Sequence, residues 1–342
     1  MKQKWWMIVS LLVMLLTGCR KELCYDHYEH APGIHLDVKA QWEQVWERDY
    51  GCDWQNHWQS EWGCMYSAFT PRVPEGLRLR TYMAGKPQEV FNMESEGEVV
   101  TLNEEGTYSL LFHNNDTEYI IYDGLAVSTR ATATTRSVSR SGFRALHEGE
   151  RTINPPDMLY GKYVAEYTAV KKADADPMDI TMYPLVYTYY IRFEFQKGFE
   201  HVVKACGAIA GMAEKVYLYD GHTGEEAATI LYDCQLGESW IEARVMTFGV
   251  PNYPGDHYNR GESEDQPFML SLEVLLKNGS TASFDFDIAG QMKTQPRGGV
   301  LVVDGIEVEM PDEPSEEGGF GVDVDDWGEV IIIPLPGINI EE

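Results

Sequence analysis

The residue with the clearest chemistry in this sequence is Cys19. A short basic head precedes an apolar stretch at residues 7–16, and Leu-Thr-Gly-Cys follows at residues 16–19. This pattern matches the lipobox of bacterial lipoprotein signal peptides, in which the cysteine thiol takes a diacylglycerol. The apolar stretch is much shorter than the ~20 residues that a membrane span needs. The sequence therefore predicts a signal peptide at 1–18 and lipidation at Cys19, where two or three acyl chains give stable anchoring. The alternative is an ordinary secretory peptide with a chance cysteine.

Five further cysteines follow Cys19 in the chain. An exported chain can form disulfides, but an odd number leaves at least one thiol free or paired between molecules. The local pairings to test are Cys52 with Cys64 and Cys206 with Cys234. Buried free thiols are an equal alternative.

Two other groups contain the residue types of metal ligands. Cys24, His27 and His30 offer one sulfur and two nitrogens to zinc, but a fourth ligand is not evident. The aspartates of residues 323–326 resemble a calcium loop only in part, since Pro334 stands where that loop needs a glutamate. No G-x-S-x-G, G-x-x-x-x-G-K-[ST] or H-E-x-x-H motif occurs. The sequence therefore predicts no metal, no cofactor and no enzymatic activity.

The composition limits the partners of the protein. Its 342 residues include 27 Lys+Arg and 55 Asp+Glu, which gives a formal net charge of −28. Nucleic-acid binding is excluded because it needs clustered Lys and Arg to replace the counterions of the phosphates. Hydrophobic residues make up 44% of the chain, which excludes disorder of the whole.

Five tryptophans lie close together near the N-terminal end. They are Trp42, Trp46, Trp54, Trp58 and Trp62. The spacing of four between the last three predicts one face of a helix. One interpretation is a sugar-stacking platform, because indole faces suit pyranose rings. The other, which we favour, is a helix or long loop that packs these rings onto the first sheet.

Alternating apolar residues and frequent turn signals predict an all-β protein with two antiparallel β-sandwich domains. A lipid-anchor tether at 19–33 leads to an N-terminal domain at 34–125. Residues 126–157 are rich in Ser, Thr and Arg and are predicted to form an exposed linker. The C-terminal domain is predicted at 158–310, and an acidic tail with a terminal strand at 311–342.

Two dipeptides predict hairpins in the second domain, Asn278-Gly279 and Asp304-Gly305. Near the C-terminal end an apolar run predicts one more strand on a long lead. Its candidate residues for strand exchange are Val330, Ile331, Ile332, Ile333 and Leu335. A strand on such a lead can pair with its own sheet or with a neighbour's sheet.

Several stretches resemble a group of Bacteroidales lipoproteins with a domain of unknown function. They include GCRKELCYDHYEH at 18–30, WEQVWERDYGCDWQNHW at 42–58, GTYSLLFHNNDTEYIIYDGL at 106–125, NPPDMLYG at 154–161 and GAIAGMAEKVYLYDG at 207–221. That group is similar to the anchoring and accessory subunits of fimbriae, the fimbrillin superfamily.

The resemblance implies two tandem transthyretin-like β-sandwich domains, a lipid at Cys19 and a place at the cell surface on the outer membrane. It also implies a non-enzymatic role as a fimbrial anchor or accessory subunit. Such a subunit pairs β-strands with filament subunits, and residues 330–335 would be the candidate strand. The alternative function is a surface glycan-binding lipoprotein that uses the tryptophans of segment 42–62.

Overall fold

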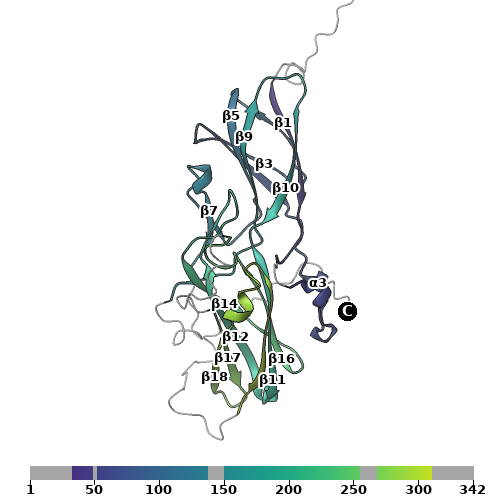
Figure 1. Ribbon diagram of the computed structural model, residues 1–342, viewed down its shortest axis with the longest axis vertical. Helices are drawn as coiled ribbons and strands as arrows, with labels where there is room; N and C mark the ends of the chain where they lie inside the picture. Colours follow the sequence, from purple (N-terminus) through teal and green to yellow (C-terminus); the bar gives the residue numbers. More distant parts are fainter. Residues whose placement is uncertain (1–32, 49–51, 138–149, 255–267, 310–342) are drawn as a thin grey trace, which may run out of the picture.

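The protein consists of two β-sandwiches joined end to end in an elongated molecule (Figure 1). The structure is a computed structural model, and it describes residues 33–48, 52–137, 150–254 and 268–309. The α-helices of these ranges are single turns, α3 (Trp54–His57) and α4 (Ala289–Met292). None of the described helices is long and apolar enough to cross a membrane. The predicted all-β class is confirmed.

The first sandwich is a single seven-stranded sheet that folds over its own core. In spatial order its strands are β3 (Lys86–Glu94), β2 (Gly76–Met83), β5 (Gly106–Asn114), β9 (Tyr160–Ala169), β10 (Asp176–Pro184), β1 (Ile34–Trp42) and β4 (Val99–Leu102). Strands β9 and β10 pair only at one end, through Tyr183 with Gly161 and Pro184 with Tyr160. The sheet opens beyond these pairs, so strands from its two halves face each other across one apolar core.

Alternation along the strands builds this core. In β1, Ile34, Leu36 and Val38 are buried, and the residues between them are more exposed. They pack in one cluster with residues of the opposite half of the sheet, Leu77 and Leu79 among them. A period of two places every second side chain on the same face, so the apolar alternation of the sequence fixes which face is buried.

The second sandwich has two sheets. The four-stranded sheet has the order β15 (Gln235–Leu236), β16 (Trp240–Thr247), β11 (Tyr187–Lys197) and β19 (Gly299–Glu307); the five-stranded sheet has the order β18 (Thr281–Asp287), β17 (Met269–Leu276), β12 (Val202–Ala213), β14 (Ala227–Asp233) and β8 (Thr152–Ile153). Buried side chains of both sheets, such as Ile191, Ile209 and Leu272, form the core between them.

One predicted hairpin of this sandwich is confirmed and the other is wrong. Strands β17 and β18 are antiparallel around Asn278-Gly279, with Gly279 at a φ of 82°. At Asp304-Gly305 the chain does not reverse, because β19 continues beside β11 in a parallel pair. Gly305 has a φ of 79° and lies where the register of this pair shifts. A turn dipeptide can thus also mark a β-bulge inside one strand.

A small third sheet and an apolar cluster lie where the two sandwiches meet (Figure 1). The sheet has the order β13 (Val216–Tyr217), β7 (Thr132–Thr135) and β6 (Ile120–Asp123). The cluster contains Tyr82 and Leu111 of the first sandwich, Leu185 and Val186 between β10 and β11, and Phe248 just after β16. Continuous apolar packing therefore joins the two halves of the molecule.

The strands of the structure divide differently from the predicted segments. Strands β9 and β10 were expected in the domain at 158–310, but both pair in the first sheet. Strands β7 and β8 lie within 126–157, the predicted linker, and both pair with other strands. Residues 138–149 of that segment lie outside the described residues. Apolar alternation predicts a strand, but it does not tell which sheet the strand joins.

Candidate functional site

The predicted lipidation and strand-exchange residues lie outside the described residues. These are Cys19 and Val330, Ile331, Ile332, Ile333 and Leu335. The candidate zinc set of Cys24, His27 and His30 and the aspartates of 323–326 lie outside them as well. Within the described ranges no group of three or more His, Cys, Asp or Glu side chains is arranged to hold a metal ion. The site that the structure does describe is the tryptophan-rich segment.

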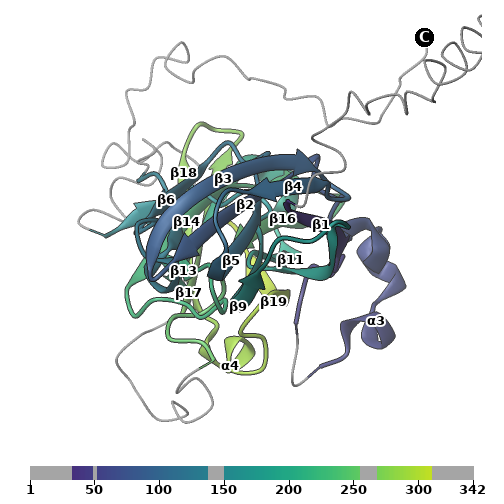
Figure 2. The same ribbon diagram turned by 90° about the horizontal axis from the view of Figure 1, so that it is seen from above.

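Residues 52–69, here called the aromatic strap, connect β1 to β2 by way of the second sandwich. The strap has three short helical turns, α3, η1 (Ser60–Trp62) and η2 (Tyr66–Phe69), in place of the single helix that the tryptophan spacing predicts. Figure 2 shows α3 at the side of the molecule, outside the strands of its body. The strap rests on Tyr190 of β11 and Val300 of β19. The expectation that the tryptophans pack onto the first sheet holds for Trp42, which contacts the core of the first sandwich. It is wrong for the rings of the strap, since they cover the four-stranded sheet of the second sandwich.

Trp58 is the centre of the strap. Its ring lies 4.7 Å from the Trp62 ring, 5.4 Å from the Phe69 ring and 5.8 Å from the Tyr190 ring, measured between centroids. Its Nε1 donates a hydrogen bond to the carbonyl oxygen of Cys64 at 2.8 Å. Edge-to-face and offset contacts of this kind stabilise aromatic clusters beyond the area that they bury. The Trp58 ring therefore packs against other rings of the protein and stays partly exposed.

The remaining tryptophans are also packed. Trp46 and Trp62 are 2% and 3% exposed, and Trp42 and Trp54 are half-buried. Trp54 Nε1 donates a hydrogen bond to Gln295 Oε1 at 3.0 Å, and Trp42 Nε1 donates one to a backbone oxygen of the first sandwich. A sugar-stacking platform needs an indole face open to solvent, and this packing leaves little of these rings for one.

A buried arginine holds the strap to the sheet below it. Arg192 of β11 is 3% exposed, and its Nη1 donates to the Tyr190 hydroxyl at 3.0 Å and to the Trp62 carbonyl oxygen at 3.4 Å. The guanidinium carbon lies 4.6 Å from the centroid of the Trp240 ring. The carboxylate of Glu242 accepts hydrogen bonds from the Tyr190 hydroxyl at 2.6 Å and from Trp240 Nε1 at 2.9 Å.

Two carboxylates lie close to the guanidinium of Arg192. Arg192 Nη1 lies 3.5 Å from Glu242 Oε2, and its Nε donates to Glu194 Oε1 at 3.2 Å. Burial raises the pKa of Tyr190, and the hydrogen bond to Glu242 raises it further, so the phenol stays protonated and donates. A buried guanidinium is tolerated only when carboxylates and hydrogen-bond acceptors surround it, and Arg192 has both.

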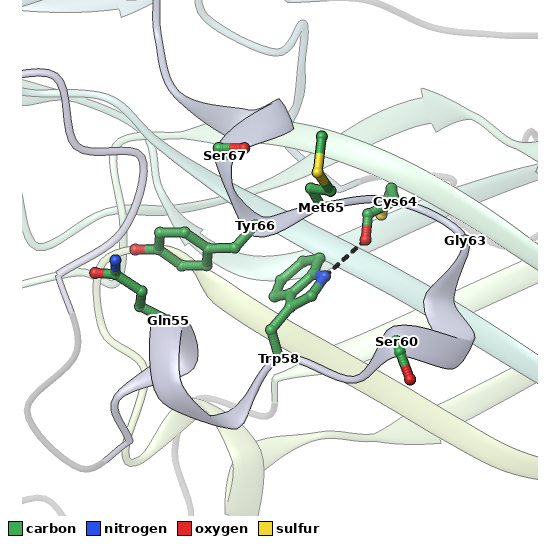
Figure 3. A pocket seen from close by; sticks show the side chains of 8 residues that line it. All are labelled: Gln55, Trp58, Ser60, Gly63, Cys64, Met65, Tyr66 and Ser67. Carbon is green, nitrogen blue, oxygen red and sulfur yellow. Dashed lines mark hydrogen bonds between the residues drawn. The ribbon is translucent and has the colours of Figure 1, made fainter.

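A cavity of about 680 Å³ lies on the outer side of the strap (Figure 3). It is lined by Gln55, Trp58, Ser60, Gly63, Cys64, Met65, Tyr66 and Ser67. The Tyr66 hydroxyl donates to Glu47 Oε1 at 2.9 Å, and burial, followed by this hydrogen bond, raises the pKa of Tyr66. The lining carries no carboxylate, imidazole or amine, and its titratable groups are the Cys64 thiol and the Tyr66 phenol.

Among the described residues neither predicted disulfide, Cys52 with Cys64 or Cys206 with Cys234, is formed. Cys64 lines the cavity of the strap. Cys206 of β12 is opposite Asp233 of β14, and Cys234 follows directly, so the two thiols lie near each other. Burial raises the pKa of the Cys234 thiol, and the neighbouring Cys206 raises it further. Such a thiol is largely protonated at neutral pH and a poor nucleophile.

Some residues of the site had no signal in the sequence. Gln295 joins the strap to β19, because its Oε1 accepts from Trp54 Nε1 and from the backbone N–H of Val300 at 2.6 Å. Gly298 has a φ of 75°, and a Cβ there would lie 2.7 Å from the carbonyl oxygen of Trp46. Only the folded chain brings these residues together. Arg192 alone carried a hint, as a basic residue in the middle of an aromatic-rich strand.

Comparison with known proteins places the fold and the strap in context. Residues 66–233 match the family described as domain of unknown function DUF5119. A Bacteroides ovatus protein with the provisional name fimbrium anchoring subunit Fim4B is 22% identical over 350 residues, covering 95% of each chain. A solved structure of a protein of that species, provisionally described as an adhesin, aligns with a TM-score of 0.58 at 21% identity. That alignment covers 87% of this chain and 99% of the solved one. Residues 66–233 of the chain are therefore similar to the DUF5119 family, and its two-sandwich fold is that of the solved Bacteroides protein.

Proposed function

We propose that the protein is a non-enzymatic accessory subunit of a surface fimbria, of the anchoring type. The observation that carries the proposal is the similarity to the fimbrium anchoring subunit, which extends over 95% of both chains. A match of this extent includes both sandwiches and the strap, so it is not the sharing of one common module. The uncharged and mostly apolar lining of the cavity also favours a binding or structural role over catalysis.

The proposed anchor is a lipid on Cys19. Strand β1 begins at Ile34, only 15 residues after Cys19, and it enters the first sandwich at the end remote from the second (Figure 1). A lipid at Cys19 would hold the first sandwich next to the outer membrane and direct the second sandwich away from it. The acidic balance of the chain fits this arrangement, because negative charge does not attract the polypeptide to anionic lipid heads.

The proposed partner is a filament subunit, bound through β-strand pairing. Residues 330–335 supply the candidate strand, whose backbone would give affinity and whose alternate side chains would give specificity. Glycan binding through segment 42–62 is the weaker alternative, because Trp46 and Trp62 are buried and Trp58 packs against other rings and is only partly exposed. Calorimetry of the purified protein against a panel of surface glycans should give flat traces; a titration that saturates would favour the alternative.

The proposal is tested in cells that produce the protein. Feeding an alkyne-labelled fatty acid should label the wild-type chain and leave Cys19→Ala unlabelled. Deletion of the gene should release filaments into the medium, and wild-type protein supplied in trans should return them to the cells. Truncation before residue 330 should also release filaments if the terminal strand makes the contact. Filaments that stay attached in the deletion strain would refute an anchoring role.

A further inference from the structure

The first and last described strands each pair in parallel with a strand that meets the junction of the two sandwiches. Strand β1 pairs with β10 in parallel from Leu36 with Asp176 to Trp42 with Met182. The other edge of β1 pairs with β4, so β1 is held on both sides. Pulling on the chain before β1 therefore drags an interior strand along its own axis.

The second parallel pair repeats this arrangement at the other end of the molecule. Strand β19 pairs with β11 from Gly299 with Tyr189 to Glu307 with Lys197. Strands β10 and β11 follow each other in the chain with two residues between them. The described chain thus has one direct mechanical route between its ends, which runs from β1 to β10, through the junction to β11, and across to β19.

The direction of pairing decides how these strands respond to tension. In a parallel pair, pulling the N-terminal end of one strand against the C-terminal end of the other slides the strands along each other. The evenly spaced hydrogen bonds between them are then strained together, whereas an antiparallel pair pulled at adjacent ends opens one bond at a time. When the ends of the chain are pulled apart, the strands of both pairs, β1–β10 and β11–β19, are pulled along each other in this sliding geometry.

Backbone contacts extend this route across the junction. After β1, the N–H of Glu43 donates to Met182 O at 3.0 Å, and the N–H of Thr188 donates to Trp46 O at 2.8 Å. The segment after β1 therefore binds the end of β10 and the start of β11. Gly298, just before β19, lies against the oxygens of Trp46 and Thr188, where a Cβ would be 2.7 and 2.8 Å away. The connection between the sandwiches therefore does not depend only on Leu185 and Val186, the two residues that link β10 to β11.

We propose that β1–β10 and β11–β19 are two mechanical clamps in series, and that the protein acts as a tension-resistant link between a membrane anchor and its load. The inference rests on the proposed function, since only a chain held at one end and pulled at the other carries such a load. The clamp β1–β10 bears tension wherever on the second sandwich a filament binds. The clamp β11–β19 bears it when the filament holds the chain beyond residue 309.

Force spectroscopy on single molecules tests the proposal. The chain from residue 19 onward, with Cys19→Ser to prevent lipidation, is pulled between tags at its two ends. The same chain with its second tag inserted between Asn103 and Glu104 is the control. Because Ile34 is opposite Leu102 at the end of β4, this second geometry peels β1 away from β4 bond by bond. Equal thermal unfolding midpoints of the two tagged proteins show that only the direction of force differs.

The first rupture force should be severalfold higher for end-to-end pulling than for the control geometry. Equal forces, or a lower force end to end, would overturn the proposal. A second test uses Lys39, whose side chain is exposed. Along a strand, successive backbone N–H groups point in turn toward the strands on its two sides. The N–H groups of Val38 and Ala40 donate on the β4 side, so the N–H group of Lys39 points toward β10.

Lys39→Pro should therefore lower the end-to-end rupture force and leave the control geometry unchanged, while Lys39→Ala should behave as wild type. An unchanged end-to-end force in a folded Lys39→Pro protein would count against the clamp. These measurements use purified protein, so they are independent of the fatty-acid labelling and filament-release experiments. A protein that is lipidated and retains filaments but ruptures at low force would refute the clamps alone.

Discussion

The burial of His113 leads us to expect that the protein loses stability in mild acid. Its imidazole in β5 is fully buried, Nδ1–H donates to the carbonyl oxygen of Asn114 at 2.7 Å, and Nε2 accepts from Arg80 Nε at 3.4 Å. The neutral ring therefore satisfies both neighbours, and a second proton at Nε2 would face the guanidinium of Arg80. Burial lowers the pKa of His113 to about 4, and the two nearby arginines, Arg80 and Arg78, act in the same direction.

The size of the effect follows from the difference in proton binding between the folded and unfolded chains. At pH 7 neither state carries the proton on His113, so this contribution to stability is fully present. As the pH falls from 6.5 towards 4, the unfolded chain binds a proton that the folded chain rejects, and the free energy of unfolding decreases. A shift from 6.5 to about 4 corresponds to a loss of about 3 kcal/mol at the acidic end.

Urea unfolding followed by circular dichroism, repeated between pH 7 and pH 4, measures this loss. His113→Gln is the matched variant, since its amide can donate and accept but does not titrate. The difference in free energy of unfolding between wild type and variant should change by about 3 kcal/mol over this range, whereas the acidic residues common to both cancel. Parallel pH profiles for the two proteins, or a His113 ring that titrates near pH 6.5 in the folded protein by NMR, would refute the reasoning.

Two further predictions concern the strap and its seat on the second sandwich. Trp62→Ala should lower the free energy of unfolding of this sandwich by about 3–5 kcal/mol, because it leaves a cavity at a buried site. Met65→Ala, at a position that is 72% exposed, should change the free energy of unfolding little. Urea titration measures both variants, and equal effects would contradict the docking of the strap. Gly298→Ala should destabilise by about 1–3 kcal/mol, because its φ is positive and the new Cβ meets backbone oxygens. Gly279→Ala has a similar φ with open space around it, so a thermal midpoint that falls as far in Gly279→Ala as in Gly298→Ala would contradict the clash.

The sequence predicts local structure well where a short pattern determines it. The alternation of Ile34, Leu36 and Val38 identifies both a strand and its buried face, and Asn278-Gly279 identifies a hairpin. These features depend on neighbours within a few residues, which is the range over which periodicity and turn chemistry act.

Partners that lie far apart in the chain are not encoded in such patterns. The tryptophan spacing suggests a helix, yet the strap forms three short turns, and its rings pack on Tyr190 of β11 and Val300 of β19. Asp304-Gly305 is typical of a hairpin turn, but β19 continues past it because the strand pairs with β11 on both sides of this dipeptide. The candidate site depends on contacts such as that of Trp54 with Gln295, 241 residues apart, which only the folded chain supplies.

The detour of the strap sets an order of events during synthesis. Because Trp54 bonds to Gln295, the segment between β1 and β2 cannot reach its folded structure until nearly the whole polypeptide has left the ribosome. Several large aromatic rings would stay uncovered in the meantime, as an adhesive patch on an incomplete chain. The two sandwiches should therefore complete their folding together. A fragment that ends after the first sandwich would leave the aromatic residues of the strap exposed to solvent.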